Sequence, residues 1–286
     1  MKVLNTPFIL LIFAFVLVSC SSDDNDSNND NELSLDYQEL LNVSYGNDSN
    51  QVFDLYLPAN RTLATKVMVL VHGGSWVAGD KNDMEDIKDA MRANYPDIAV
   101  VNINYRLAGP GISPYPMQIN DISSVINYLK TNQNTYTISN DYGFIGVSAG
   151  GHLSLLWSYA FDTNNDVDMV CSIVGPTNFT DPNYLNNPLS SLGLSTFGID
   201  INDTAFLEEM SPYHNATTSS PPTVLFYGGL DPLVPTSQGV ELAAKLNQLS
   251  VPHEFTLYPN EGHGWTGANL EDSYAKLNTF IETYFE

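Results

Sequence analysis

A serine flanked by glycines is the side chain in this sequence best placed to act as a nucleophile. The run GVSAG at residues 146–150 follows the apolar, strand-like segment YGFIGV and begins the helix-like segment AGGHLSLLW. Glycines on both flanks let a strand and a helix pass closely at a tight turn, which exposes the hydroxyl between them. We therefore predict that Ser148 is the nucleophile and that the Ala149 N–H, at the helix start, faces a developing oxyanion.

A serine hydroxyl attacks well only when an imidazole accepts its proton and a carboxylate orients that imidazole. Both partners follow later in the sequence, each on a loop after a strand-like run. Asp231 lies in GGLDPLVP after TVLFY, and His263 lies between glycines in EGHG after the last strand-like run. Loops that follow parallel strands meet at one edge of a sheet. The prediction is a triad of Ser148, His263 as the base and Asp231 as the orienting acid.

A second glycine-rich loop offers further hydrogen-bond donors. The run HGGSW at residues 72–76 follows the strand-like VMVLV, and its glycines allow backbone N–H groups to turn inward. A developing alkoxide needs two or three fixed donors at about 3 Å. We expect the N–H groups of Gly74 and Ser75 to join that of Ala149 in an oxyanion hole, with His72 bracing the loop. An ordinary glycine turn is the alternative interpretation of this run.

The remaining histidines and the tryptophans have weaker claims to the site. His152 lies one turn beyond Ser148 on the same expected helix, so a packing or hydrogen-bonding role is predicted for it. Trp76 and Trp265 each adjoin a predicted site residue and are candidates for stacking on a sugar or an aromatic acyl group. Large aromatic residues fill cores more often than they bind substrates, so a structural role is the alternative for both.

The elements that would hold these loops alternate between short β-branched runs and amphipathic stretches from about Leu33 onward. This alternation is typical of an α/β protein with a mostly parallel sheet. Runs such as VMVLV are apolar throughout, as expected for strands that helices cover on both faces. The prediction is an eight-stranded, mostly parallel sheet whose early strands are antiparallel. The expected strands are Gln38–Val43, Gln51–Leu57, Lys66–Val71, Ile98–Asn104, Tyr142–Val147, Val170–Val174, Thr223–Tyr227 and Glu254–Tyr258.

Helical patterns fit between and after the later strands. Pro116 suits a first helical turn and Thr236 suits an N-cap. The stretch 176–222 is long for a connection between two strands, and it is rich in Asn, Pro, Ser and Leu. We therefore expect short helices there that form a small cap over the site. The strongest expected helices are Pro116–Thr131, Ala149–Ala160, Thr236–Leu249 and Leu270–Phe285.

The N-terminus resembles a secretion signal. A basic start precedes an apolar run that ends in LVSC, which resembles a bacterial lipobox. We expect a signal peptide at residues 1–19, a lipidated Cys20 and an acidic flexible tether at 20–33, followed by a catalytic domain at 34–286. This organisation predicts a lipid anchor in the bacterial envelope, in the outer membrane, and the acidic tether favours the cell surface. An ordinary secretion signal with a nearby cysteine is the alternative.

Composition narrows the range of partners. The 286 residues are 43% hydrophobic, which suits one globular domain, and 10 Lys plus Arg against 33 Asp plus Glu give a net charge of −23. That charge argues against nucleic acid and against a basic membrane-docking face, so membrane contact is expected through the N-terminal lipid alone. If Cys20 is lipidated, Cys171 has no partner for an intrachain disulfide. No metal-ligand or phosphate-cradle spacing is present, so no metal and no cofactor are expected.

Several of these segments together resemble one enzyme family. The set HGGSW, NYRL, GVSAGGHL, GGLDPLVP and EGHGW, spread over residues 72–265, is similar to the carboxylesterase branch of the α/β-hydrolase fold. That branch includes hormone-sensitive-lipase-like esterases and bacterial acetyl or feruloyl esterases. The resemblance implies the triad named above, and it implies that Arg106 of NYRL follows a strand and forms an ion pair. Ser75 stands where lipase-type motifs have a third glycine, which favours the acetyl- or feruloyl-esterase-like members.

The function that these predictions favour is hydrolysis of short-chain acyl or feruloyl esters by a serine carboxylesterase, through an acyl-enzyme. Because an envelope protein meets polymers outside the cell, the expected substrate is an acylated plant or algal polysaccharide. The oligomeric state is left open. One fold serves many activities, so three alternatives remain: a dipeptidyl-peptidase-like serine peptidase, an arylformamidase, and a non-catalytic surface protein that binds glycans.

Overall fold

The computed structural model describes residues 35–286, and within them eight strands form one sheet. The strands are β1 (Gln38–Ser44), β2 (Val52–Leu57), β3 (Val67–Val71), β4 (Ala99–Ile103), β5 (Tyr142–Val147), β6 (Val167–Ile173), β7 (Thr223–Gly228) and β8 (His253–Tyr258). Their order across the sheet is β1-β2-β4-β3-β5-β6-β7-β8. The pairs of β2 with β1 and β4 are antiparallel, and all other pairs are parallel. The predicted sheet is therefore confirmed, with strand bounds that agree within three residues.

Predictions for the N-terminal segment lie outside the described residues. They are the signal peptide at 1–19, the lipidated Cys20 and the tether at 20–33. Within residues 35–286, no helix combines the length and the apolar character that a membrane span requires.

Side chains that alternate along the central strands build two hydrophobic cores. In β3, Val67, Val69 and Val71 face one core, whereas Met68 and Leu70 face the other. All five side chains are fully buried. Each strand position therefore contributes to a core, which is the reason that this segment is apolar throughout rather than alternating.

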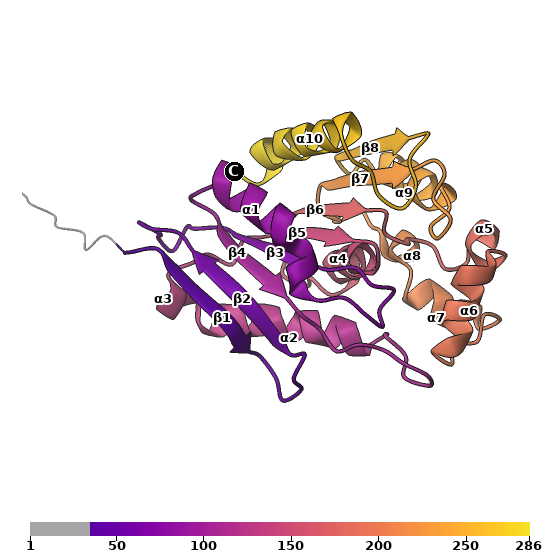
Figure 1. Cartoon of the computed structure of the whole chain (residues 1–286), viewed down its shortest axis with the longest axis horizontal. Coiled ribbons are helices and arrows are strands. Elements are labelled where there is room, and N and C mark those ends of the chain that lie inside the picture. The colour runs from indigo at the N-terminus through magenta and orange to yellow at the C-terminus, as the bar shows by residue number, and fades with distance from the viewer. Residues whose placement is uncertain (1–34) are drawn as a thin grey trace, which may run out of the picture. The chain divides into compact units, whose positions relative to one another are not determined.

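Helices cover both faces of the sheet, as predicted. The larger ones are α1 (Glu85–Asn94), α2 (Met117–Thr131), α4 (Ala149–Ala160), α9 (Ser237–Leu249) and α10 (Ala268–Tyr284). Apolar side chains of α2, α4 and α9 pack in the core that contains Val69, and those of α1 and α10 pack in the core that contains Met68. Figure 1 shows α1 in front of the strands, with α2 and α4 behind them. Shorter helical turns lie at Lys81–Met84 (η1) and Gln133–Tyr136 (α3).

Two details differ from the sequence predictions, and a third agrees with them only in part. The hydrophobic pattern does not predict α1, because Ile87 and Met91 are its only large apolar side chains. Pro116 was expected inside the first turn of α2, but it lies at the N-cap, after a cis peptide bond with Tyr115. Thr236 does lie at the N-cap of α9, although its side chain makes no capping hydrogen bond.

The segment 176–222 forms short helices, as predicted. They are α5 (Pro182–Leu185), α6 (Pro188–Thr196), α7 (Thr204–Glu209) and α8 (Pro212–Asn215). The side chains of Asp181, Asn187 and Asp203 accept backbone hydrogen bonds at the starts of α5, α6 and α7. Figure 1 shows α5, α6 and α7 beyond the arrowheads of the parallel strands, where loops that follow those strands also gather.

Candidate active site

Ser148 occupies the predicted turn between β5 and α4, and its backbone is strained. Its φ is +53° and its ψ is −118°, a combination that residues with side chains rarely adopt. Close packing explains the flanking glycines. A Cβ on Gly146 would lie 2.2 Å from the carbonyl oxygen of Gly150, and a Cβ on Gly150 would lie 2.1 Å from that of Val71. Larger residues at these positions would force β3, β5 and α4 apart.

The structure brings the three predicted triad residues together. Ser148 follows β5, Asp231 follows β7 and His263 follows β8, so all three lie at the carboxyl edge of the parallel strands. Nε2 of His263 lies 2.9 Å from Oγ of Ser148, and Nδ1 of His263 lies 2.6 Å from Oδ2 of Asp231. Both distances are within hydrogen-bonding range.

The surroundings of Asp231 determine how the imidazole is oriented. Its side chain is 1% exposed, and its other oxygen accepts hydrogen bonds from the backbone N–H groups of Leu233 and Val234. The buried carboxylate is thus held from two sides, and Oδ2 is left to accept from Nδ1–H of His263. With the proton on Nδ1, the neutral imidazole has a lone pair on Nε2 that can accept the Ser148 proton.

The oxyanion loop at residues 72–79 has an unusual backbone. Gly74, Ser75 and Trp76 have φ values of +112°, +51° and +64°, which turn the chain tightly after β3. Ser75 lines the same pocket as Ser148. Among the described residues, the Ser75 N–H has no backbone acceptor, and the first N–H groups of a helix, such as that of Ala149, have none within the helix.

The three predicted oxyanion donors therefore differ in position. Ser75 and Ala149 adjoin the nucleophile in space and in sequence, respectively. Gly74 belongs to the same turn but does not line the pocket, and its carbonyl oxygen accepts from the N–H groups of Val77 and Ala78. The Gly74 N–H, like that of Ser75, has no backbone acceptor among the described residues, so its role as an oxyanion donor stays a prediction.

The His72 side chain helps to hold the start of this loop in place, as predicted. Its side chain is 1% exposed and stacks on Tyr105, with ring centroids 4.2 Å apart and an angle of 9° between the planes. The Tyr105 hydroxyl donates to the His72 carbonyl oxygen at 2.8 Å. Burial lowers the pKa of His72, so the neutral imidazole fits its role as a packing residue.

A pocket opens beside the nucleophile. Trp76 contributes to its wall, as predicted, and is itself 7% exposed. The cap supplies three large side chains: Tyr184 from α5, Leu189 from α6, and Phe197, which directly follows α6. Sequence patterns predicted a cap here but not these individual residues, because the short helices carry no periodic signal that orients them. The remaining lining residues are Ser75, Pro176, Ser190, Gly193, Leu233 and Val234.

Trp265 is not part of that pocket, which corrects the prediction that it contacts substrate beside His263. The chain turns at Gly264, and the Trp265 indole N–H donates to Oγ of Ser273 on α10 at 3.1 Å. Its ring packs on Tyr258 and lines a separate cavity between α1 and α10, together with Ile87. Adjacency in sequence to His263 did not place the side chain on the same side of the sheet.

His152 has the structural role predicted for it. It is 1% exposed; its Nδ1 accepts from the Trp76 indole N–H at 3.1 Å, and its Nε2 donates to the Met210 carbonyl oxygen at 2.8 Å. Desolvation lowers its pKa to about 4, against a smaller opposing effect of the Met210 carbonyl. His152 therefore connects the wall of the pocket to the cap as a neutral side chain.

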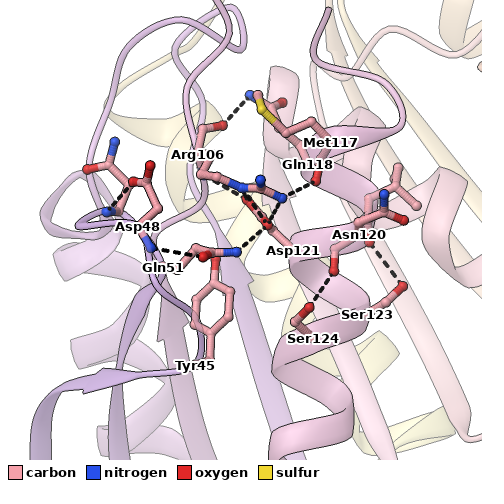
Figure 2. A network of polar contacts seen from close by, with 12 residues as sticks. Tyr45, Asp48, Gln51, Arg106, Met117, Gln118, Asn120, Asp121, Ser123 and Ser124 are labelled. Atoms are coloured by element: carbon pink, nitrogen blue, oxygen red, sulfur yellow. Dashed lines mark hydrogen bonds and ion pairs between the residues drawn. The ribbon is translucent and has the colours of Figure 1, made fainter.

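The ion pair expected for Arg106 is also present. Its guanidinium contacts Asp121 of α2, with Nη2 and Oδ1 2.6 Å apart, and the Asp121 side chain is 0% exposed. Nε and the backbone N–H of Arg106 donate to the same carboxylate, and Gln51 adds a further donor at 2.8 Å (Figure 2). The network fastens the loop after β4 and the β1–β2 turn to α2.

Comparison with known proteins agrees with this architecture. A model of the BD-FAE family matches residues 53–246. Esterase LipC of Mycobacterium tuberculosis is 26% identical over 251 residues, which cover 80% of this chain and 60% of LipC. This chain therefore spans less than two thirds of that relative's length.

Solved structures share the fold at low sequence identity. A truncated form of a carbohydrate esterase from gut microbiota has a TM-score of 0.70 at 22% identity, covering 85% of this chain and 96% of that one. An acetyl ester-xyloside bifunctional hydrolase from Caldicellulosiruptor lactoaceticus has a TM-score of 0.65 at 19% identity, covering 81% and 88%. These likenesses show an α/β-hydrolase fold. Because the family model spans most of the chain, including Ser148 and Asp231, the protein belongs to the BD-FAE family.

Proposed function

We propose that this protein is a serine carboxylesterase that hydrolyses short-chain acyl or feruloyl esters. The observation that carries the proposal is the chain of hydrogen bonds from Ser148 through His263 to Asp231, at 2.9 and 2.6 Å. The strained turn and the adjoining donors supply the rest of an acyl-transfer site. Esterase LipC, as a related protein named for ester hydrolysis, supports the same reaction type.

In the proposed first step, Oγ of Ser148 forms a bond to the carbonyl carbon of the ester while Nε2 of His263 takes the hydroxyl proton. The carbonyl π electrons move onto oxygen, and the N–H groups of Ser75 and Ala149 donate to that oxyanion. When the oxyanion collapses, the bond to the alcohol oxygen breaks. His263 returns its proton to the departing alcohol, and the acyl group stays on Ser148.

The second step repeats these roles with water. His263 takes a proton from a water molecule, whose oxygen attacks the acyl carbon in the same oxyanion site. Collapse breaks the bond to Ser148, which regains the proton from His263, and the free acid leaves. Asp231 keeps Nδ1–H of His263 in place through both steps, because its second oxygen is held by two backbone N–H groups.

The proposed substrate is an acetyl or cinnamoyl ester on a plant or algal polysaccharide. Among the described residues that line the pocket, none carries a charge, and Trp76, Tyr184 and Phe197 supply aromatic surface. An uncharged acyl group suits such a pocket. The carbohydrate esterase and the acetyl ester-xyloside hydrolase that share the fold carry names consistent with ester groups on carbohydrate.

Hydrolysis of a small panel of substrates tests this proposal. The panel contains p-nitrophenyl acetate, butyrate and octanoate, methyl ferulate, acetylated xylan and an aminoacyl-p-nitroanilide, each measured beside Ser148→Ala. We expect turnover of short esters or of the xylan that disappears in the variant. Cleavage of the anilide alone would identify a peptidase instead. If no substrate shows turnover that depends on Ser148, a glycan-binding role takes precedence.

The proposed location is the cell envelope, through a lipid on Cys20. The LVSC sequence at residues 17–20 supports this location. We expect the wild-type chain to incorporate labelled palmitate. We expect Cys20→Ser to lose this label and to be released from membranes. An unlabelled, soluble wild-type protein would contradict it.

A further inference from the structure

The oxyanion loop holds a backbone conformation that its own residues do not favour. Positive φ values at Ser75 and Trp76, +51° and +64°, are disfavoured for residues with a Cβ. Such conformations persist only where the surrounding structure determines them. The groups that hold this loop in place are therefore candidates for a role in the reaction.

The Trp76 carbonyl oxygen is one of the points at which the rest of the molecule holds the loop. It accepts two hydrogen bonds of 2.8 Å, one from the Ala108 N–H and one from the side-chain amide of Gln118. The same amide nitrogen donates its second hydrogen to the Arg106 carbonyl oxygen, also at 2.8 Å. Gln118 thus joins the oxyanion loop to the loop that follows β4.

Gln118 is held firmly enough to serve this purpose. It lies on α2 with 0% exposure, one helical turn before Asp121, which binds the Arg106 guanidinium. Figure 2 shows Gln118 and Asp121 on α2, with Arg106 facing both. Because the Arg106 side chain and its carbonyl oxygen are both bound to α2, the frame around the Gln118 amide has little freedom to move.

The amide oxygen of Gln118 provides an independent indication. Within residues 35–286, this oxygen is buried and accepts no hydrogen bond. A buried polar atom without a partner is destabilising. What the amide contributes at this position is therefore its two N–H donors, which contact the two loops.

We propose that Gln118 is a positioning residue for the proposed esterase reaction. By fixing the Trp76 carbonyl, it restrains the two preceding peptide groups and so keeps the Ser75 N–H directed toward the oxyanion formed at Ser148. The inference rests on the proposed function and adds a residue that does not contact substrate.

Loss of this restraint acts on the transition state. An oxyanion donor gains its full interaction only when negative charge has developed, so a loosened loop lowers kcat and leaves ground-state binding nearly unchanged. Removing one donor outright lowers kcat by about 100- to 1,000-fold in a serine hydrolase. Because Gln118 acts through Trp76, we expect a smaller loss of about 10- to 100-fold.

The test compares Gln118→Met with Gln51→Met. Methionine has a similar shape and lacks both donors. Gln51 donates to Asp121 at 2.8 Å in the same network but does not contact the oxyanion loop, so its variant is the matched control. The measurements are kcat and KM for p-nitrophenyl acetate, the melting temperature, and inhibition by a short-chain trifluoromethyl ketone.

The ketone reports on the oxyanion directly. Oγ of Ser148 adds to its carbonyl carbon, the π electrons form an oxyanion, and the proton passes to His263. We expect Gln118→Met to lower kcat by about 10- to 100-fold and to weaken inhibition by the ketone by the same factor. KM should change less than threefold. Gln51→Met should change kcat, KM and inhibition by the ketone less than threefold. Gln118→Asn, which keeps an amide but shortens its reach, should show an intermediate loss if the methionine variant does not fold.

Each result separates this inference from the proposed function. If wild-type turnover depends on Ser148 but Gln118→Met behaves like Gln51→Met, or changes KM alone, the positioning role is wrong and the esterase proposal stands. If Gln118→Met does not fold and Gln118→Asn keeps wild-type kcat and ketone affinity, the positioning role is also wrong. If wild type shows no turnover that depends on Ser148, both proposals fail.

Discussion

The pocket beside Ser148 has two walls that are built in different ways. One wall, which we call the floor, is formed by residues of the loops at 72–79, 146–150 and 228–234, which lie at the carboxyl ends of strands. The loop at 259–264, which carries His263, adjoins this wall through the hydrogen bond to Ser148. The other wall, which we call the roof, is the cap at 176–222, whose helices contain between four and nine residues.

The floor is tightly packed, whereas the roof is more open, and the roof residues that line the pocket are uncharged. In the floor, a Cβ on Gly228 would lie 1.9 Å from the Gly262 carbonyl oxygen, yet around Gly193 in the roof no atom lies within 4 Å of an added Cβ. The sequence from 182 to 199 contains no charged residue, and α6 leaves Leu189 and Leu192 more than half exposed. Under the proposed function, we therefore expect the floor to carry the catalytic groups and the roof to select the acyl group.

The largest expected effect is in the floor, at the orienting acid. Asp231→Asn preserves shape but favours the His263 tautomer that lacks a lone pair toward Ser148. We expect kcat for p-nitrophenyl acetate to fall by about 1,000- to 10,000-fold, with little change in relative preference among acyl chains. An unaltered melting temperature serves as the control. A loss below tenfold would show that Asp231 does not orient the base.

The next comparison is between the stability effects of replacing one glycine in each wall. Gly150→Ala places a methyl group where the Val71 carbonyl oxygen lies, 2.1 Å away, and should lower the free energy of unfolding by about 3 kcal/mol or more. Gly193→Ala in α6 meets no atom and gains helix propensity, so it should stabilise by about 0.5–1 kcal/mol. Urea unfolding measures both. Equal effects of the two substitutions would remove the distinction between floor and roof.

Acid should weaken the junction between the walls, at His152. Its pKa is lowered from 6.5 to about 4 by burial, so below pH 6.5 the unfolded chain binds a proton that the folded chain does not. Stability therefore falls as the pH falls from about 6.5 to about 4, by roughly 3 kcal/mol at most from this group. The lowered pKa of His72 acts in the same direction.

The pH effect is measured by urea unfolding at several pH values. His152→Gln removes the titrating group, so the loss of stability between pH 6.5 and 4 should be smaller in this variant than in wild type. The same slope in both proteins would assign the acid sensitivity to other groups.

The smallest expected effect concerns the roof alone. Leu189 lines the pocket and Leu192 does not, although both are on α6 and are 56% and 64% exposed. Leu189→Ala removes apolar contact worth about 1 kcal/mol, so we expect KM for p-nitrophenyl octanoate to rise about fivefold. The acetate should be hydrolysed as before. Leu192→Ala is the matched control, and an equal effect there would mean that α6 acts through stability rather than contact.

Prediction from sequence succeeded where local pattern and topology agree. The central strands are continuous apolar runs, and Ser148, Asp231 and His263 each follow a predicted strand, so their convergence at one sheet edge could be expected. The prediction for Trp265 was wrong because its indole N–H donates to Ser273 of α10 and its ring packs on Tyr258, contacts that adjacency to His263 in the sequence does not predict. The helix α1 was missed because charged residues dominate its sequence.

By itself, the sequence determined the order of the strands along the chain, the glycine-flanked turn and the identity of the residues that could exchange a proton. These features depend on local sterics and on hydrophobic period, which neighbouring residues carry. Only the tertiary structure decided that Gln118 meets Trp76 and that Leu189 rather than Leu192 lines the pocket. Such contacts depend on how each helix is rotated about its axis, and that rotation is set by packing against residues far away in the sequence.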